Sequence, residues 1–140
     1  MSIATQGSSV VLDASAALRA VIDRNEQALN VFSAVEDGEI VAAWPELALV
    51  EIANGLLRLV RGRLLAEANA LNATSRFLAA PVRREPLALL TLPAFHLAAE
   101  RGLSVYDAAY VVLAESLDAR LVTADRRLAE ATEKSILIGG

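Results

Sequence analysis

The sequence predicts an α/β protein in which five parallel strands form a doubly wound sheet flanked by helices on both faces. Short β-branched and aliphatic runs alternate with longer segments of helical periodicity, so a helix separates each strand from the next. Hydrophobic residues make up 55% of the chain, which suits strands that are buried on both faces. The length of 140 residues, with no linker or internal repeat, predicts a single domain over residues 1–140.

The first part of the chain predicts two strands and two helices. Residues 10–12, Val-Val-Leu, indicate a buried strand, and residues 15–21 indicate the helix that follows it. A second helix is expected over about 24–37, because Gly38 stands where a helix commonly ends. Residues 39–42 are expected to form the second, short strand.

The segment after Pro45 predicts an amphipathic helix, because its apolar residues repeat at a spacing of three and then four. The face expected to pack on the sheet consists of Leu47, Val50, Asn54 and Leu57. A further helix is expected over about 63–79.

The second half of the chain predicts three more strands. Pro81 and Pro86 are expected to bracket a turn before a third strand at 87–90, and a helix over 93–101 should end at Gly102. The remaining expected elements are a helix over 105–117, a strand at 121–123, a short helix after Asp125 and a fifth strand at 136–138.

Composition limits the chemistry that the chain can perform. It has no cysteine and one histidine, His96, so any metal must be held by oxygen or by that histidine. We assign His96 no catalytic role, because a lone histidine is usually structural. The net charge of −4 is not that of a protein that binds nucleic acid over its whole surface. With no secretion signal, and with its longest uncharged stretch (86–99) too short to span a membrane, we expect a cytoplasmic protein.

Four acidic residues form the candidate site. In an open parallel sheet the functional crevice lies beyond the carboxyl ends of the strands, and Asp13 and Asp125 directly follow two of the expected strands. Glu51 lies beside the apolar stripe of its helix, where a solvated charge is unfavourable. Asp107 shares a helix face with Tyr110, so we expect it to point inward.

Each of these acids also has a simpler interpretation. Asp13 and Asp125 could cap the helices that follow them, Ser104 and Asp107 could form a capping box, and Glu51 could face solvent. We favour the joint interpretation, in which the four carboxylates gather and divalent cations offset their repulsion. Hard oxygen ligands suit Mg²⁺ or Mn²⁺, which can activate water to cleave a phosphodiester. Ser15 and Thr123 each lie two residues from one of the aspartates and could hydrogen-bond to a nearby carboxylate or to a metal-bound water.

At this point the chain resembles the PIN-domain family, and most of all the VapC toxins. The resemblance rests on four segments in order: VVLDASAAL at 10–18, PEL at 45–47 with EIAN at 51–54, LSVYDA at 103–108, and LVTAD at 121–125. It implies a PIN-like sheet and Mg²⁺- or Mn²⁺-dependent endoribonuclease activity, with an RNA substrate, a VapB-type antitoxin and a homodimer as partners. It also implies that Asp13, Glu51, Asp107 and Asp125 form the catalytic and metal-binding set, supported by Ser15, Asn54 and Thr123.

Arginines near the acids are candidate RNA contacts. A basic lip could guide the RNA backbone into the acidic crevice, although the same residues could simply be solvated helix ends. The candidates are Arg58, Arg61, Arg126 and Arg127.

Two other function classes compete with a nuclease. A catalytically silent PIN-fold module could bind RNA or protein without turnover, but it would have no reason to retain four crowded acids. A receiver domain would need an aspartate after the third strand, and a dehalogenase-type phosphatase would need one where Ser15 stands. These last two classes are excluded by their residues.

Overall fold

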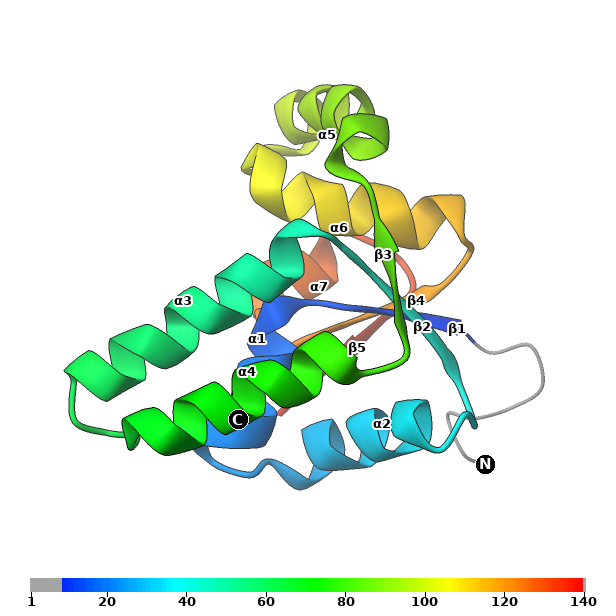
Figure 1. Ribbon diagram of the computed structural model, residues 1–140. Helices are drawn as coiled ribbons and strands as arrows, with labels where there is room; N and C mark the ends of the chain where they lie inside the picture. The colour runs from blue at the N-terminus through cyan, green and yellow to red at the C-terminus, as the bar shows by residue number, and fades with distance from the viewer. Residues whose placement is uncertain (1–8, 140) are drawn as a thin grey trace.

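The sheet has five parallel strands in the order β3-β2-β1-β4-β5 (Figure 1). It is seen in a computed structural model that describes residues 9–139. This architecture confirms the predicted parallel sheet flanked by helices. The strands are β1 (Ser9–Leu12), β2 (Val41–Pro45), β3 (Val82–Glu85), β4 (Arg120–Thr123) and β5 (Ser135–Leu137).

Helices cover both faces of the sheet (Figure 1). On one side α6 packs against β1, β2 and β4, and α5 lies against the outer side of α6. On the other side α1 packs against α2 and α3, and α3 pairs with α4. The helices are α1 (Ala14–Ile22), α2 (Glu26–Glu36), α3 (Leu47–Arg61), α4 (Glu67–Ala79), α5 (Leu87–Arg101), α6 (Val105–Ser116) and α7 (Arg126–Glu130). Among the described residues, no helix is long and apolar enough to cross a membrane.

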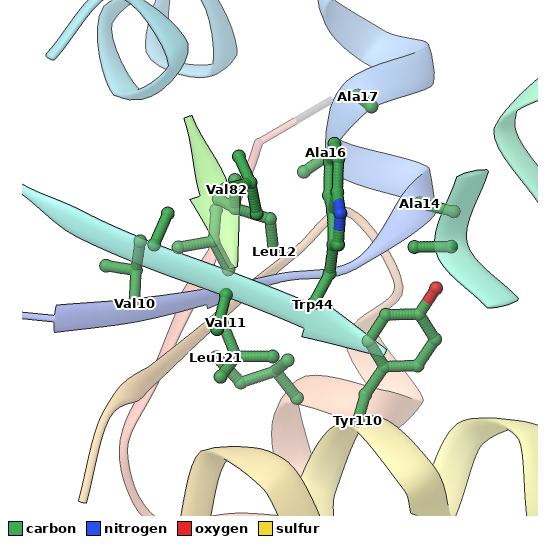
Figure 2. Close-up of a cluster of buried hydrophobic side chains, with 14 of the residues drawn as sticks. Val10, Val11, Leu12, Ala14, Ala16, Ala17, Trp44, Val82, Tyr110 and Leu121 are labelled. Atoms are coloured by element: carbon green, nitrogen blue, oxygen red, sulfur yellow. The ribbon is translucent and has the colours of Figure 1, made fainter. Parts of the chain in front are cut away.

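The central strand β1 is packed from both sides. Its residues Val10, Val11 and Leu12 are at most 1% exposed, as expected for a strand between two helical layers. Figure 2 shows Tyr110 of α6 on the same side of the sheet as Val11, and Trp44 of β2 standing on the opposite side. Burial on both faces fixes the end of β1, and therefore the position of the residue that follows it.

The prediction of a third strand at 87–90 was wrong. The strand is Val82–Glu85, and the leucine-rich run begins α5, which continues through Pro93 to Arg101. Leucine and alanine are strong helix formers, whereas β3 is an edge strand in which Arg83 and Arg84 are exposed, so hydrophobicity pointed to the wrong segment. Pro81 and Pro86 therefore bracket this strand, not a turn. The residue after β3 is Pro86, so the argument against a receiver domain still holds.

The predicted packing face of α3 was also wrong. Its buried residues are Ala48, Ile52 and Leu56, whereas Val50 is 72% and Leu57 39% exposed. This face approaches α1 closely at Gly55. A Cβ added at Gly55 would lie only 2.7 Å from Leu18 of α1. Since position 51 lies between positions 48 and 55 on this face, close packing of α3 on α1 carries Glu51 toward the sheet.

Smaller differences concern the ends of elements. The second strand spans 41–45 instead of 39–42, and the helix predicted from 63 begins at Glu67. Gly38 follows α2 with a φ of +76°, the left-handed conformation that favours glycine after a helix. These shifts leave the sheet order and the position of the acidic residues unchanged.

Candidate active site

The innermost acid is Asp13, at the carboxyl end of the central strand. Its side chain is 7% exposed, and its backbone N–H donates to the carbonyl of Val122 on β4 at 2.9 Å. Within the described residues, this side chain makes no capping hydrogen bond to α1, so the capping interpretation does not account for it. The position instead places a carboxylate between the ends of β1 and β4.

Two hydroxyl groups hold one oxygen of Asp13. Its Oδ2 accepts hydrogen bonds from the Oγ of Ser15 at 2.6 Å and from the Oγ1 of Thr123 at 2.7 Å. Both hydroxyls are fixed in turn, because the N–H of Ala124 donates to Ser15 at 2.9 Å and that of Asp125 donates to Thr123 at 3.0 Å. Residues from α1 and β4 thus orient the buried carboxylate.

Glu51 reaches the same region from α3. It is half-buried, and its Oε1 accepts a 2.5 Å hydrogen bond from the hydroxyl of Tyr110 on α6. Burial raises the pKa of Glu51, and the negative charges of Asp13 and Asp107 raise it further against the opposing effect of the tyrosine. The ionisation of Glu51 therefore depends on the charges of Asp13 and Asp107.

Asp107 and Asp125 form the outer part of the site. Asp107 is half-buried in the first turn of α6, where its N–H donates to the Oγ of Ser104 at 3.0 Å. Burial raises the pKa of Asp107, and the charge of Asp125 adds to the effect. Asp125 is exposed and caps α7, since its Oδ1 accepts from the N–H groups of Arg127 at 2.9 Å and Leu128 at 3.3 Å. The capping interpretation is therefore correct for Asp125, although one of its oxygens is not used in this way.

The charges of the four acids act on one another's ionisation. Burial raises the pKa of Asp13, which the nearby charge of Asp107 raises further, while Ser15 and Thr123 oppose the shift. In residues 9–139, however, no three carboxylate or histidine side chains stand in an arrangement that could already hold a metal ion. The fold brings the acids to one place without drawing their oxygens around a common centre.

The remaining predicted residues of α3 have exposed side chains. Asn54 is exposed, because it is two residues beyond the buried Ile52 and so roughly 200° around α3. Arg58 and Arg61 are exposed in the last turns of α3. Asn54 lies three residues after Glu51, so the two are neighbours on the surface of α3, and a supporting role for Asn54 stays a prediction.

The two arginines of α7 lie beside the acids. Arg126 and Arg127 are both exposed, and the Nη2 of Arg127 donates to the carbonyl of Gly102 at 2.7 Å. The positive charge of Arg127 partly offsets the raised pKa of Asp107. Arg127 is therefore anchored where its charge acts on Asp107.

Sequence reasoning missed the role of the Tyr110 hydroxyl. Tyr110 was expected only to share a face with Asp107, yet its ring is 1% exposed and its hydroxyl contacts Glu51. A tyrosine three residues after a candidate acid, at an otherwise apolar position, is the signal that could have identified it.

A separate surface hollow does not belong to this site. It has a volume of about 450 Å³ and contains none of the four acids. Ion pairs between Arg101 and Glu115 and between Lys134 and Asp118 line it. The hollow is therefore separate from the four acids.

Comparison with known proteins agrees with the fold and the motifs. The family model of the PIN domain matches residues 10–134. Ribonuclease VapC3 of Pyrobaculum aerophilum is 39% identical over 126 residues, covering 86% of this chain and 92% of the relative. Ribonuclease VapC9 of Mycobacterium tuberculosis is 38% identical over 121 residues, covering 86% of this chain and 89% of the relative.

Solved structures show the same architecture. The crystal structure of PAE2754 from Pyrobaculum aerophilum aligns with a TM-score of 0.72 and 28% identity, covering 95% of this chain and 88% of that one. VapBC2 from Rickettsia felis, bound to a DNA fragment from their promoter, aligns with a TM-score of 0.64 over 92% of this chain and 96% of that one. At 14% identity the second likeness concerns the fold alone. From its sequence and its fold together, the chain belongs to the PIN domain family.

Proposed function

We propose that this protein is a Mg²⁺- or Mn²⁺-dependent endoribonuclease, the toxin of a VapBC-type toxin–antitoxin pair. The observation that carries the proposal is the buried Asp13, fixed by two hydroxyls beside Glu51 and Asp107 at the end of the central strands. Relatives that are 38–39% identical over most of their length are named as VapC ribonucleases, which supports the same activity here. An RNA substrate would place the protein in the cytoplasm.

The residues of the site fit a hard divalent cation. Every candidate ligand is a carboxylate oxygen, the kind of donor that Mg²⁺ and Mn²⁺ prefer. Burial and mutual repulsion raise the pKa values of Asp13, Glu51 and Asp107, and a cation among them would relieve both the desolvation and the repulsion. We propose Asp13, Glu51, Asp107 and Asp125 as the ligands. When bound, the cation would supply a water of lowered pKa and positive charge beside the scissile phosphate.

The protein's own groups would orient the reaction. Ser15 and Thr123 hold Asp13 through Oδ2, which leaves its second oxygen available to a ligand. Asp125 stands at the exposed rim, with its Oδ1 accepting from the start of α7. The hydrogen bonds that fix Asp13 reduce the orientations open to its carboxylate, which lowers the entropic cost of binding a cation.

We propose that exposed arginines bind the RNA backbone near the acids. Arg127 is the strongest candidate, because its link to Gly102 holds it beside Asp107. Arg126, Arg58 and Arg61 would extend the contact along the rim. Guanidinium groups suit phosphate recognition, and a local basic rim is compatible with a net charge of −4.

We further propose a VapB-type antitoxin and a second copy of the chain as partners. Exposed apolar side chains on α5 are compatible with a protein partner that covers this helix. Leu89 is 66%, Leu92 67% and Phe95 59% exposed, more apolar surface than a helix usually leaves to water.

The test is RNA cleavage by the purified protein with Mg²⁺ or Mn²⁺, compared with Asp13→Asn. Wild type should cut RNA only with the metal, and the variant should lose at least 100-fold in rate by the usual effect of removing a metal ligand's charge, roughly 3 kcal/mol. Trp44 is the only tryptophan and is fully buried, so its fluorescence checks that both proteins are folded. Equal cleavage by the two proteins would refute the catalytic assignment.

One observation favours a second candidate, the catalytically silent PIN-fold module. Across residues 9–139 no metal-ready group of three ligands is present. A module of this kind would bind RNA or a protein but would show no metal-dependent cleavage and no Mn²⁺ binding by calorimetry. The same comparison of wild type with Asp13→Asn therefore separates the two candidates.

A further inference from the structure

We propose that Tyr110 is a positioning residue, whose hydroxyl holds Glu51 in the orientation that metal binding requires. The inference rests on the proposed metal-dependent function and deepens it. Tyr110 itself would contact neither the metal nor the RNA, and would act only through Glu51.

The contact joins two helices, α6 and α3, which lie on opposite sides of the sheet. Tyr110 lies on α6 and Glu51 on α3, 59 residues apart, and the Tyr110 hydroxyl is 2.5 Å from Oε1 of Glu51. The Tyr110 ring is 1% exposed. Figure 2 shows it projecting from α6 with its hydroxyl directed toward the side of Ala14, the first residue of α1. The phenol therefore bridges from the α6 layer to the acids beside α1.

The direction of the hydrogen bond follows from the chemistry of the two groups. A phenol carries a proton at neutral pH and donates it, and the Oε1 of Glu51 is the acceptor. A carboxylate that accepts from a neutral hydroxyl forms a strong, charge-assisted bond. Only Oε1 of Glu51 is engaged by Tyr110, and the second carboxylate oxygen is not held by it.

A packing role alone does not explain the hydroxyl. Phenylalanine would fill almost the same space among the buried residues of α6 without placing a polar group in the interior. A buried hydroxyl is unfavourable unless it is hydrogen-bonded, and here the bond goes to a half-buried acid. A glutamate side chain has several rotatable bonds, so an anchor at one oxygen reduces the conformations that a ligand would have to select.

Asp13 is held in the same manner. Ser15 and Thr123 engage one oxygen of Asp13, and Tyr110 engages one oxygen of Glu51. The two inner acids thus each have one oxygen tied by hydroxyl donors from a different element of the fold. Groups that orient metal ligands in this way commonly change metal affinity by about 10- to 100-fold when removed.

The experiment compares Tyr110→Phe with a matched control, Tyr106→Phe, on the purified full chain. Tyr106 lies one turn earlier on α6 and is 67% exposed, so the control removes the same atom from the same helix. Three quantities are measured: Mn²⁺ affinity by calorimetry, the rate of RNA cleavage, and the melting temperature without metal. We expect Tyr110→Phe to weaken Mn²⁺ binding about 10-fold, with a comparable loss of cleavage rate, and Tyr106→Phe to leave both unchanged.

A double-mutant cycle separates positioning from general structural damage. If Tyr110 acts through Glu51, then adding Tyr110→Phe to Glu51→Gln should change Mn²⁺ affinity by less than about twofold. A full additional loss in the Glu51→Gln background, or Mn²⁺ affinity in Tyr110→Phe equal to wild type, would overturn the inference. A wild type that binds Mn²⁺ but cuts no RNA would refute the proposed nuclease alone, because Mn²⁺ affinity would still decide the role of Tyr110. A wild type that binds no Mn²⁺ would refute both.

Discussion

Thr123, the last residue of β4, donates a 2.7 Å hydrogen bond to Oδ2 of Asp13, which lies 110 residues earlier at the end of β1. Both side chains are buried, and β1 and β4 are neighbours in the sheet. A single contact thus links the pairing of the two central strands to the orientation of the innermost acid. Changes at Thr123 should therefore affect stability and metal binding together.

Thr123→Val should separate the hydroxyl from the shape of the side chain. Valine keeps the branched form but leaves Asp13 with one donor fewer and the N–H of Asp125 without its acceptor. We expect a loss of about 1–3 kcal/mol in the free energy of unfolding, together with weaker Mn²⁺ binding. Urea denaturation followed by Trp44 fluorescence measures the first, and calorimetry the second. Thr123→Ser, which keeps the hydroxyl, should retain Mn²⁺ affinity; an equal loss in the two variants would contradict this account.

The stability of the metal-free protein should depend on the ionisation of Asp13. Burial raises its folded-state pKa above the unfolded value, so the folded chain binds more protons between these two pKa values. The contribution of Asp13 to stability is therefore present at low pH and is lost as pH rises through the folded pKa. Asp13→Asn removes this contribution, so its melting temperature relative to wild type should increase with pH from about 4 upward. Thermal melts in EDTA across pH 4–8 measure the difference, and a difference that falls with pH would contradict the prediction.

Asp125 has two separable roles. Asp125→Asn should keep the cap of α7, because an asparagine oxygen can accept the same N–H bonds, but it should lose the negative charge. We expect nearly unchanged stability with weaker Mn²⁺ binding and slower cleavage. Asp125→Ala should show the same functional loss and also lose about 0.5–2 kcal/mol of stability. Full activity in Asp125→Asn would remove this residue from the proposed ligand set.

RNA affinity should depend on Arg127 through charge. In an Asp13→Asn background, which prevents cleavage, Arg127→Ala should weaken RNA binding and reduce the slope of log affinity against log salt by about one. Arg24 provides the control, because it is exposed beyond the end of α1 opposite to Asp13. Fluorescence anisotropy with labelled RNA at several salt concentrations measures both. A salt slope that Arg127→Ala leaves unchanged would exclude a phosphate contact.

Much of the fold could be predicted because burial and sequence pattern agreed. The run Val10–Leu12 is apolar throughout, as a strand covered on both faces must be, and the rule for parallel sheets placed Asp13 and Asp125 at one edge. The third strand was missed because an edge strand with a solvent-exposed side, Val82–Glu85, carries charges and lacks that apolar signature.

The contacts of the site could be predicted where they follow from the ends of neighbouring strands, and could not be predicted where they depend on how helices pack. The pairing of Ser15 and Thr123 with Asp13 follows from adjacent strand ends. The contact between Tyr110 and Glu51 depends on the depth at which α3 and α6 pack, which periodicity does not encode. The packing face of α3 was misassigned for a related reason, because the close approach of α3 to α1 at Gly55 is a tertiary contact that the spacing of apolar residues does not show.

The position of β4 has a consequence for the time at which activity can arise during synthesis. β1 is translated well before its neighbour β4 and the acid at position 125. A nascent chain can pair β1 with β2 early. It then still lacks β4, which pairs with the other side of β1, and Thr123, which orients Asp13. The four acids can therefore come together only after β4 and Asp125 have been translated, well after β1 and β2.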